Sequence, residues 1–511
     1  MNAAANSADT GSLAGRHRAV LVVVCLALAT VVSAVSALNV ALPSVAGSLH
    51  TTQTQLSWIV DAYALVFAAL LLPGGALGDR YGRRLVLIAG LAIFGAGSIA
   101  AMATNSPSML IAMRAVLGVG AALVMPATLS TITTTFPQAQ KPKAVGIWAG
   151  VAGASAILGL LASGVLLEWW SWRAVFALNI VLAVVAILGT VSVVPESADP
   201  QAPSLDVIGA VISVVGLAAL VYSIIEAPNE GWGNARTLVG IALGVVVLAG
   251  FVGWESTRRA PLLDPRLFAH PGFTAGTVSI CLQFLAFFGF IFLVLQYLQL
   301  VRGDRPLIAA VSLLPMAATM MPAARLAPQL AARVGSRPVC VTGLIVLSAA
   351  LLLLAQVHAD SPYWLIAVGL LLLGAGMGAA MTPATSAITD ALPAAKQGVG
   401  SAMNDLSREL GGALGIAILG SIMQSTYRNH LHPAGLPQPL AEAARGSLAL
   451  ADRIGGPVAE QARAAFTAGL HNALLFISAT SLLAAVTVAL LLRHQPKSPQ
   501  PEDRSRHLLD G

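Results

Sequence analysis

Long apolar stretches recur along the whole of this chain, separated by short breaks that carry most of its charged residues. A helix needs about 20 apolar residues to cross about 30 Å of hydrocarbon, and many of these stretches reach that length. Charged residues form only 10% of the chain and apolar residues 57%, whereas soluble domains carry roughly 25% charged residues. The sequence therefore predicts an all-helical protein that crosses a membrane many times.

Apolar length and punctuation predict fourteen membrane spans. We expect them at residues 19–42, 57–77, 85–103, 108–133, 144–166, 172–194, 206–226, 235–254, 272–298, 307–330, 338–356, 363–389, 398–423 and 470–492. Lys and Arg are concentrated in the segments that share a side with the N-terminus. Because these residues favour the cytoplasmic side, we predict a plasma-membrane protein with both termini in the cytoplasm.

A short charged turn separates the second predicted span from the third. It reads Gly75-Ala-Leu-Gly-Asp79-Arg80-Tyr-Gly82-Arg83-Arg84. Irregular backbone is not exposed to lipid, so the turn must lie at a membrane face, and its three arginines favour the cytoplasmic face. This pattern resembles the signature loop of the major facilitator superfamily of transporters. The resemblance implies two six-helix halves that move about a central cavity.

We expect Asp79 in this signature loop to act as a conformational latch. The amide-rich N-terminal end of a helix favours a carboxylate. The beginning of the thirteenth span near Gly398 is the candidate partner, in the outward-open state only.

An internal repeat supports the two-half arrangement. Pro126-Ala-Thr, ending in Phe136-Pro137, reappears as Pro383-Ala-Thr, ending in Leu392-Pro393. The copies are eight spans apart and therefore have the same orientation, which is a parallel repeat. Spans 206–226 and 235–254 are then an insertion between the halves. Fourteen spans in this order resemble the drug:proton antiporter branch, the quaternary-ammonium and multidrug exporters.

The chain therefore divides into five parts. We predict a disordered cytoplasmic tail (1–18), an N-terminal six-helix half (19–194), two inserted helices with linkers (195–271), a C-terminal six-helix half (272–492) that includes an outer loop (424–469), and a cytoplasmic tail (493–511).

Charged side chains inside spans are costly and are functional candidates by default. Asp61 and Arg114 lie at similar distances from the outer ends of the second and fourth spans. At about 1.5 Å per residue they share one depth and could pair. The pair is either a proton site tuned by the guanidinium or a structural ion pair. The segment from Arg114 to Gly118 resembles the fourth-span motif of the family, in which the arginine is linked to proton transfer.

The thirteenth span carries a second charged group. Asp405, Arg408 and Glu409 share one helical face by their spacing. Glu409 is expected about 16 Å along the helix from Gly398, close to the membrane midplane. The group is either a second proton site or an internal ion pair.

Glycines in the fourth and fifth spans predict close helix packing or an antiporter-like motif. They are Gly118, Gly150, Gly153, Gly159 and Gly164. The segment from Leu158 to Gly164 resembles the fifth-span motif of the exporters but has Leu160 in place of its proline. Ala34 also replaces the first-span aspartate that many members carry. Both departures leave open which residue couples transport to protons.

A substrate cavity is predicted among polar and aromatic residues of several spans, although an aromatic-rich helix such as the ninth span is more often packed or lipid-facing. The candidates are Asn39, Tyr63, Phe288, Tyr297 and Asn404.

No set of catalytic residues, phosphate-binding loop or metal-ligand cluster is visible in the sequence. We therefore predict no enzyme activity, no metal, no cofactor and no nucleic-acid partner. The leading hypothesis is a monomeric transporter that exports amphipathic small molecules in exchange for protons. The alternatives are a non-transporting sensor or scaffold, and a facilitator or importer of the same fold. The intact loop from Asp79 to Arg84, together with Arg114, favours transport.

Overall fold

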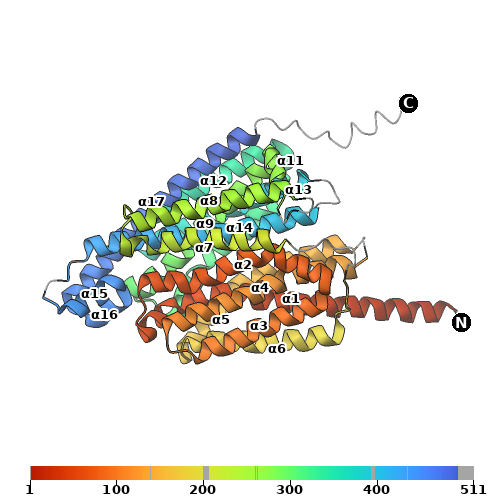
Figure 1. Cartoon of the computed structure of the whole chain (residues 1–511), viewed down its shortest axis with the longest axis horizontal. Coiled ribbons are helices and arrows are strands. Elements are labelled where there is room, and N and C mark those ends of the chain that lie inside the picture. The colour runs from red at the N-terminus through yellow and green to blue at the C-terminus, as the bar shows by residue number, and fades with distance from the viewer. Residues whose placement is uncertain are drawn as a thin grey trace.

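The computed structural model describes residues 2–137, 140–198, 206–258, 261, 263–392, 397–433 and 435–492. Every regular element within these residues is a helix. Fourteen helices are long and apolar enough to cross a membrane, which confirms the predicted number. They lie side by side in one bundle (Figure 1).

The helices of the first part of the chain overlap the predicted spans, and the first of them extends beyond its predicted span at both ends. They are α1 Asn2–Leu49, α2 Gln53–Tyr81, α3 Arg83–Ala103, α4 Pro107–Thr135, α5 Lys141–Trp169, α6 Arg173–Val193, α7 Val207–Glu230 and α8 Ala235–Thr257. The second part contains η1 Pro265–Ala269, α9 Pro271–Gln296, η2 Tyr297–Val301, α10 Pro306–Val311, α11 Leu314–Val334, α12 Ser336–Ala355, α13 Tyr363–Asp390, α14 Gln397–His430, α15 Gln438–Gly446, α16 Leu448–Ile454 and α17 Gly456–Leu491.

Two predicted boundaries are wrong. The tail expected to be disordered is helical from Asn2, because α1 continues to Leu49 without a break and its alanines favour a helix. The outer loop 424–469 is mostly helical: α14 extends to His430, and α15, α16 and the first turns of α17 fill the rest. The predicted tail 493–511 lies outside the described residues.

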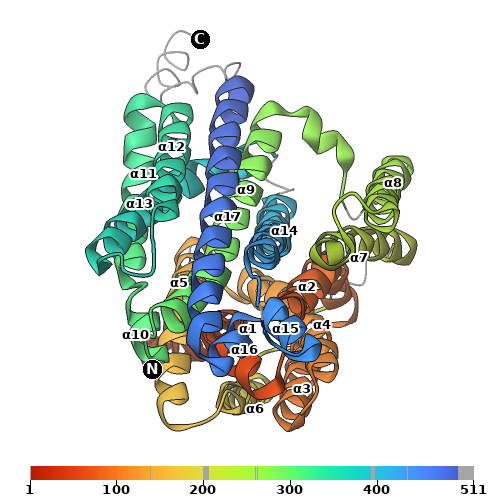
Figure 2. The ribbon, with the colours of Figure 1, turned by 90° about the vertical axis from the view of Figure 1, so that its left-hand side faces the viewer.

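The helices form two groups with a hairpin beside them. Helices α1–α6 pack on one another, as do α9–α14 with α17, and the inserted α7–α8 hairpin lies against α2 and α14 (Figure 2). We call the end of the bundle that carries α15 and α16 the α15 end. The opposite end, which carries the start of α1 and the end of α17, is the terminal end (Figure 1).

The two groups are bonded to each other at the α15 end. Gln299 in η2 donates a hydrogen bond of 2.9 Å to the carbonyl of Val40 in α1, and Arg305 pairs with Glu168 at the end of α5. Within the described residues, no hydrogen bond or ion pair joins the two groups at the terminal end. The structure therefore represents a state that is closed at the α15 end.

Glycines set the distance between helices within each group. A Cβ on Gly118 of α4 would lie 2.6 Å from the carbonyl oxygen of Tyr63 in α2, and one on Gly415 of α14 would lie 2.2 Å from the Leu285 carbonyl. Gly159 lies close to Ser33 of α1, whereas Gly164 lies close to Leu307 of α10 and so forms a contact between the two groups. Contrary to the expectation for the fifth span, a Cβ on Gly150 or Gly153 would meet no atom within 4 Å, so these two glycines do not set a helix contact.

This difference gives a paired test of packing. Gly118→Ala should destabilise the protein by about 1–3 kcal/mol, because the new methyl group meets a backbone carbonyl that cannot move independently. Gly150→Ala adds the same methyl group in open space and should leave stability unchanged or slightly raised. Thermal unfolding of the two purified variants checks this. Equal unfolding temperatures would contradict the assignment of Gly118 to the α2–α4 contact.

Candidate functional site

Arg114 lies at the centre of the contact between α4 and α2. Its side chain is buried, and its Nε donates a hydrogen bond of 2.9 Å to the carbonyl of Ile59. Its guanidinium carbon lies 4.4 Å from the centroid of the Tyr63 ring. Arg114 therefore ties α4 to one face of α2, the face that carries Ile59 and Tyr63.

The predicted Asp61–Arg114 ion pair is not formed. Both carboxylate oxygens of Asp61 are buried and have no hydrogen-bond partner, and no ion pair within 4.0 Å involves this residue among those described. The reason is the direction of the side chain, since residues two positions apart on a helix point to opposite sides. Asp61 and Arg114 lie at a similar depth in the membrane, but their side chains point in different directions.

Asp61 faces the other half of the protein. Residues four positions away share its face of α2, and these are Ser57 and Leu65. A Cβ on Gly420 of α14 would lie 2.8 Å from the Ser57 hydroxyl, and Leu65 belongs to one apolar cluster with Ala417 of α14. Asp61 thus lies in the seam between α2 and α14, and it is 0% exposed.

The charged group of α14 divides into a paired and an unpaired part. Arg408 pairs with Asp405 at 3.7 Å, and its guanidinium carbon lies 4.7 Å from the centroid of the Phe284 ring of α9. Glu409 is partly buried and forms no hydrogen bond or ion pair with the described residues. Tyr63 lies near Arg114 of its own half and near Glu409 of the other half. Tyr63 is therefore located between charged groups of the two halves.

Several buried polar atoms of the first group of helices have no partner within the described residues. Among them are Asn39 Oδ1, Tyr63 Oη, Arg114 Nη2 and both Asp61 carboxylate oxygens. Buried polar groups are almost always paired with protein or ordered water. Such atoms are therefore available to water, protons or a bound substrate.

The remaining cavity candidates have partners within the protein. The Phe288 ring packs against Gly412 of α14, where an added Cβ would lie only 2.9 Å from the ring. The centroids of the Phe288 and Phe287 rings are 5.2 Å apart. The Tyr297 hydroxyl donates to the His358 carbonyl at 2.6 Å, so Tyr297 lies at the α15 end. The Asn404 amide oxygen accepts a hydrogen bond of 3.0 Å from Thr385.

The turn between α2 and α3 is held by an acidic residue that the sequence analysis missed. Glu196 follows α6 and accepts hydrogen bonds of 3.2 Å from the backbone amides of Arg84 and Leu85. It also fills the space beside Gly82, where φ is +110°. The sequence did contain a signal for this contact: an acidic residue follows the sixth span, on the same side of the membrane as the three arginines of the turn.

Asp79 in the same turn has partners within its own half. It accepts a hydrogen bond of 2.8 Å from Arg83 and one of 3.3 Å from the hydroxyl of Ser130 in α4. The guanidinium of Arg80 lies 5.9 Å from the Tyr81 ring centroid. Asp79 forms no hydrogen bond or ion pair to the described part of α14. The latch remains a prediction for the opposite conformation.

Comparison with known proteins settles the family. The profile of the Major Facilitator Superfamily matches residues 24–416. The chain belongs to this superfamily. This transporter is 35% identical over 489 residues to the multidrug efflux pump LfrA of Mycolicibacterium smegmatis, covering 93% of this chain and 97% of the relative. It is 30% identical over 508 residues to the tetracenomycin C resistance and export protein of Streptomyces glaucescens, covering 96% and 94%.

The fold of the transporter is shared with solved structures of low sequence identity. A bacterial homologue of the lysosomal transporter Spinster, solved in an inward-facing and unoccupied conformation, is 16% identical and superposes with a TM-score of 0.69. The match covers 93% of this chain and 97% of that one. The family and the relatives, together with the fourteen apolar helices, identify the protein as a multi-pass membrane transporter rather than an enzyme.

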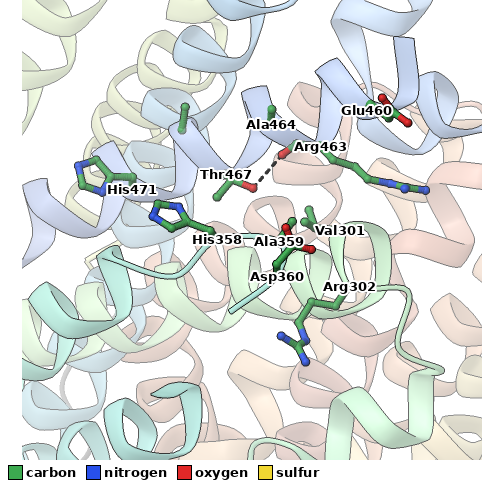
Figure 3. A pocket seen from close by; sticks show the side chains of 11 residues that line it. Val301, Arg302, His358, Ala359, Asp360, Glu460, Arg463, Ala464, Thr467 and His471 are labelled. Atoms are coloured by element: carbon green, nitrogen blue, oxygen red, sulfur yellow. Dashed lines mark hydrogen bonds between the residues drawn. The ribbon is translucent and has the colours of Figure 1, made fainter. Parts of the chain in front are cut away.

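The transporter also has a cavity away from this central region. It has a volume of about 930 Å³ and lies at the α15 end, between η2, the loop after α12 and the first turns of α17 (Figure 3). His358 and His471 lie at one side of it, and Arg302 at another. Within the described residues, no group of three or more His, Cys, Asp or Glu side chains could hold a metal ion.

Proposed function

We propose that this transporter exports amphipathic small molecules in exchange for protons, with Asp61 as the coupling residue. The relatives support the export of drugs: one is named for multidrug efflux and another for the export of tetracenomycin C. The observation that carries the coupling is the fully buried carboxyl group of Asp61, without a partner, in the seam between the two halves.

The seam gives a physical reason for coupling. An ionised carboxylate that is buried without a partner costs several kcal/mol, which is enough to oppose closure of the seam. We infer that Asp61 takes up a proton from water while the α15 end is open, keeps it when the seam closes, and releases it toward the terminal end when substrate binds from that end. Proton binding then favours the closed seam, and proton release favours its opening.

Glu409 is the second candidate for carrying the proton. It lies eight residues before Ala417 on α14, which is about 12 Å along the helix toward the terminal end. Its partial exposure and its position near Tyr63 support a role between the seam and the terminal end. A substrate that binds near Tyr63 would compete with protons for the polar groups of this region.

The orientation in the membrane belongs to the same proposal. The signature loop and both termini of the described chain lie at the terminal end (Figure 1). The arginines of the signature loop favour the cytoplasmic side. We therefore place the terminal end in the cytoplasm and the α15 end outside the cell. We also propose that one chain is the transporting unit, because both halves of the central region come from it.

Reconstituted transport tests the proposed function. Purified protein in proteoliposomes should accumulate amphipathic compounds from a panel in the more acidic compartment, against their own gradient, and a protonophore should abolish the accumulation. Accumulation in the less acidic compartment would identify an importer. Equilibration that is unaffected by the pH gradient would identify a facilitator, and no movement of any compound would favour the sensor hypothesis.

A further inference from the structure

The inserted α7–α8 hairpin is bonded to both halves at the α15 end. Toward α2, the Trp58 indole donates to Glu226 at 3.1 Å, and the Asn229 amide donates to the Thr54 hydroxyl at 3.2 Å. Toward α14, hydrogen bonds run from Ser421 to the Ile224 carbonyl and from Trp232 to the Ser425 hydroxyl, at 2.8 and 3.1 Å. The hairpin therefore bridges the seam that contains Asp61 (Figure 2).

The bond from Ser421 depends on a proline within α7. Pro228 has no backbone N–H and removes the normal helical donor for the carbonyl four residues earlier, which is that of Ile224. Ser421 supplies a replacement donor from the other half, and both Ser421 and Ile224 are buried. A buried carbonyl needs a hydrogen-bond donor. Pro228 therefore leaves the Ile224 carbonyl of α7 dependent on a donor from α14.

This bond lies next to the proposed coupling residue. Ser421 is four residues after Ala417 and shares its face of α14. Ala417, Leu65 of α2 and Ile224 of α7 belong to one apolar cluster. Any separation of α2 and α14 at the α15 end must therefore rearrange the contacts of α7 as well.

We propose that the Ser421–Ile224 hydrogen bond positions α14 in the closed state, and that the hairpin stays with α2 and releases α14 when the α15 end opens. The proposal rests on alternating access in the proposed function. The contact with α2 includes the carboxyl group of Glu226, and hydrogen bonds to charged groups are the stronger ones. The contact with α14 has one buried bond, and opening the seam exposes the freed carbonyl to water.

The test measures the closed state directly. Spin labels on Ser108 of α4 and Ala359 after α12, two exposed positions at the α15 end, report the separation of the halves after the three native cysteines are replaced. Ser421→Ala should raise the ratio of the long to the short distance roughly two- to tenfold, the effect expected for one buried hydrogen bond. Pro228→Ala should do the same, because the new backbone N–H gives the Ile224 carbonyl a donor within its own helix and weakens its need for Ser421.

The pairing itself is tested by combining the two changes. In the Pro228→Ala background, Ser421→Ala should add little, because the carbonyl then has its own donor. Ser407→Ala is the matched control, since Ser407 is a buried serine of α14 that donates to the Met403 carbonyl of its own helix at 2.6 Å. Its distance distribution should match that of the unmodified protein.

Two results would overturn the proposal. One is an unchanged distance distribution in Ser421→Ala, and the other is an equal effect of Ser421→Ala with and without Pro228. If Ser421→Ala fails to fold, the Pro228→Ala variant still tests the shift, and an unchanged distribution there also overturns it. The distance measurement uses no substrate and no pH gradient. Its outcome is therefore independent of whether the protein exports substrates in exchange for protons.

Discussion

Asp61→Asn should abolish export against a gradient while substrate still moves down its gradient. Asparagine has nearly the same shape as aspartic acid and is always neutral, so it fits the buried seam between α2 and α14. It cannot bind or release a proton, and the transport cycle then loses its link to the proton gradient. We expect uphill accumulation to fall at least tenfold.

The measurement compares uphill and downhill transport in the same proteoliposomes. Asp390→Asn at the end of α13 is the control, because Asp390 is exposed and should be replaced without effect. Glu409→Gln should behave differently from Asp61→Asn, with a changed substrate affinity and retained accumulation. If both variants still build a substrate gradient that collapses on adding a protonophore, neither carboxyl group is the coupling site.

Asp79→Asn should reduce the rate of transport at least tenfold without lowering expression or substrate binding. In the closed state the Asp79 carboxylate accepts hydrogen bonds from Arg83 and Ser130. In the opposite state we expect it to contact the first turn of α14, where the helix dipole favours a negative charge. A neutral amide weakens the charge-assisted bond and the dipole interaction, so exchange between the states becomes slow or one-sided.

Counterflow measures the rate of exchange between the two states, and equilibrium binding measures the affinity for substrate. Binding measured with the purified variant should match that of the unmodified protein, whereas exchange of internal for external substrate should be slow. Ser197→Ala is the control, because it removes a hydrogen bond of 3.3 Å to Arg83 in the same turn without changing a charge. Normal transport by a well-expressed Asp79→Asn protein would rule out the latch.

The sequence alone determined the number of spans, their order and the place of the inserted hairpin. These features follow from one-dimensional constraints: the thickness of the hydrocarbon fixes helix length, and lipid excludes irregular backbone. The turn from Gly75 to Arg84 could be placed for the same reason. Where the chain leaves the membrane this constraint ends, and for loop 424–469 the sequence suggested at most one short surface helix, where the structure has α15, α16 and the first turns of α17.

Only the tertiary structure decided which side chains meet. Asp61 and Arg114 share a depth, but depth does not give the direction in which a side chain leaves its helix, and this direction put Asp61 in the seam with α14. Gly118 and Gly150 look alike in sequence, and only one has a neighbour close enough to need a glycine. The bond from Ser421 to Ile224 joins residues 197 positions apart. Contacts of this kind depend on the rotation and packing of whole helices, which no local pattern in the chain records.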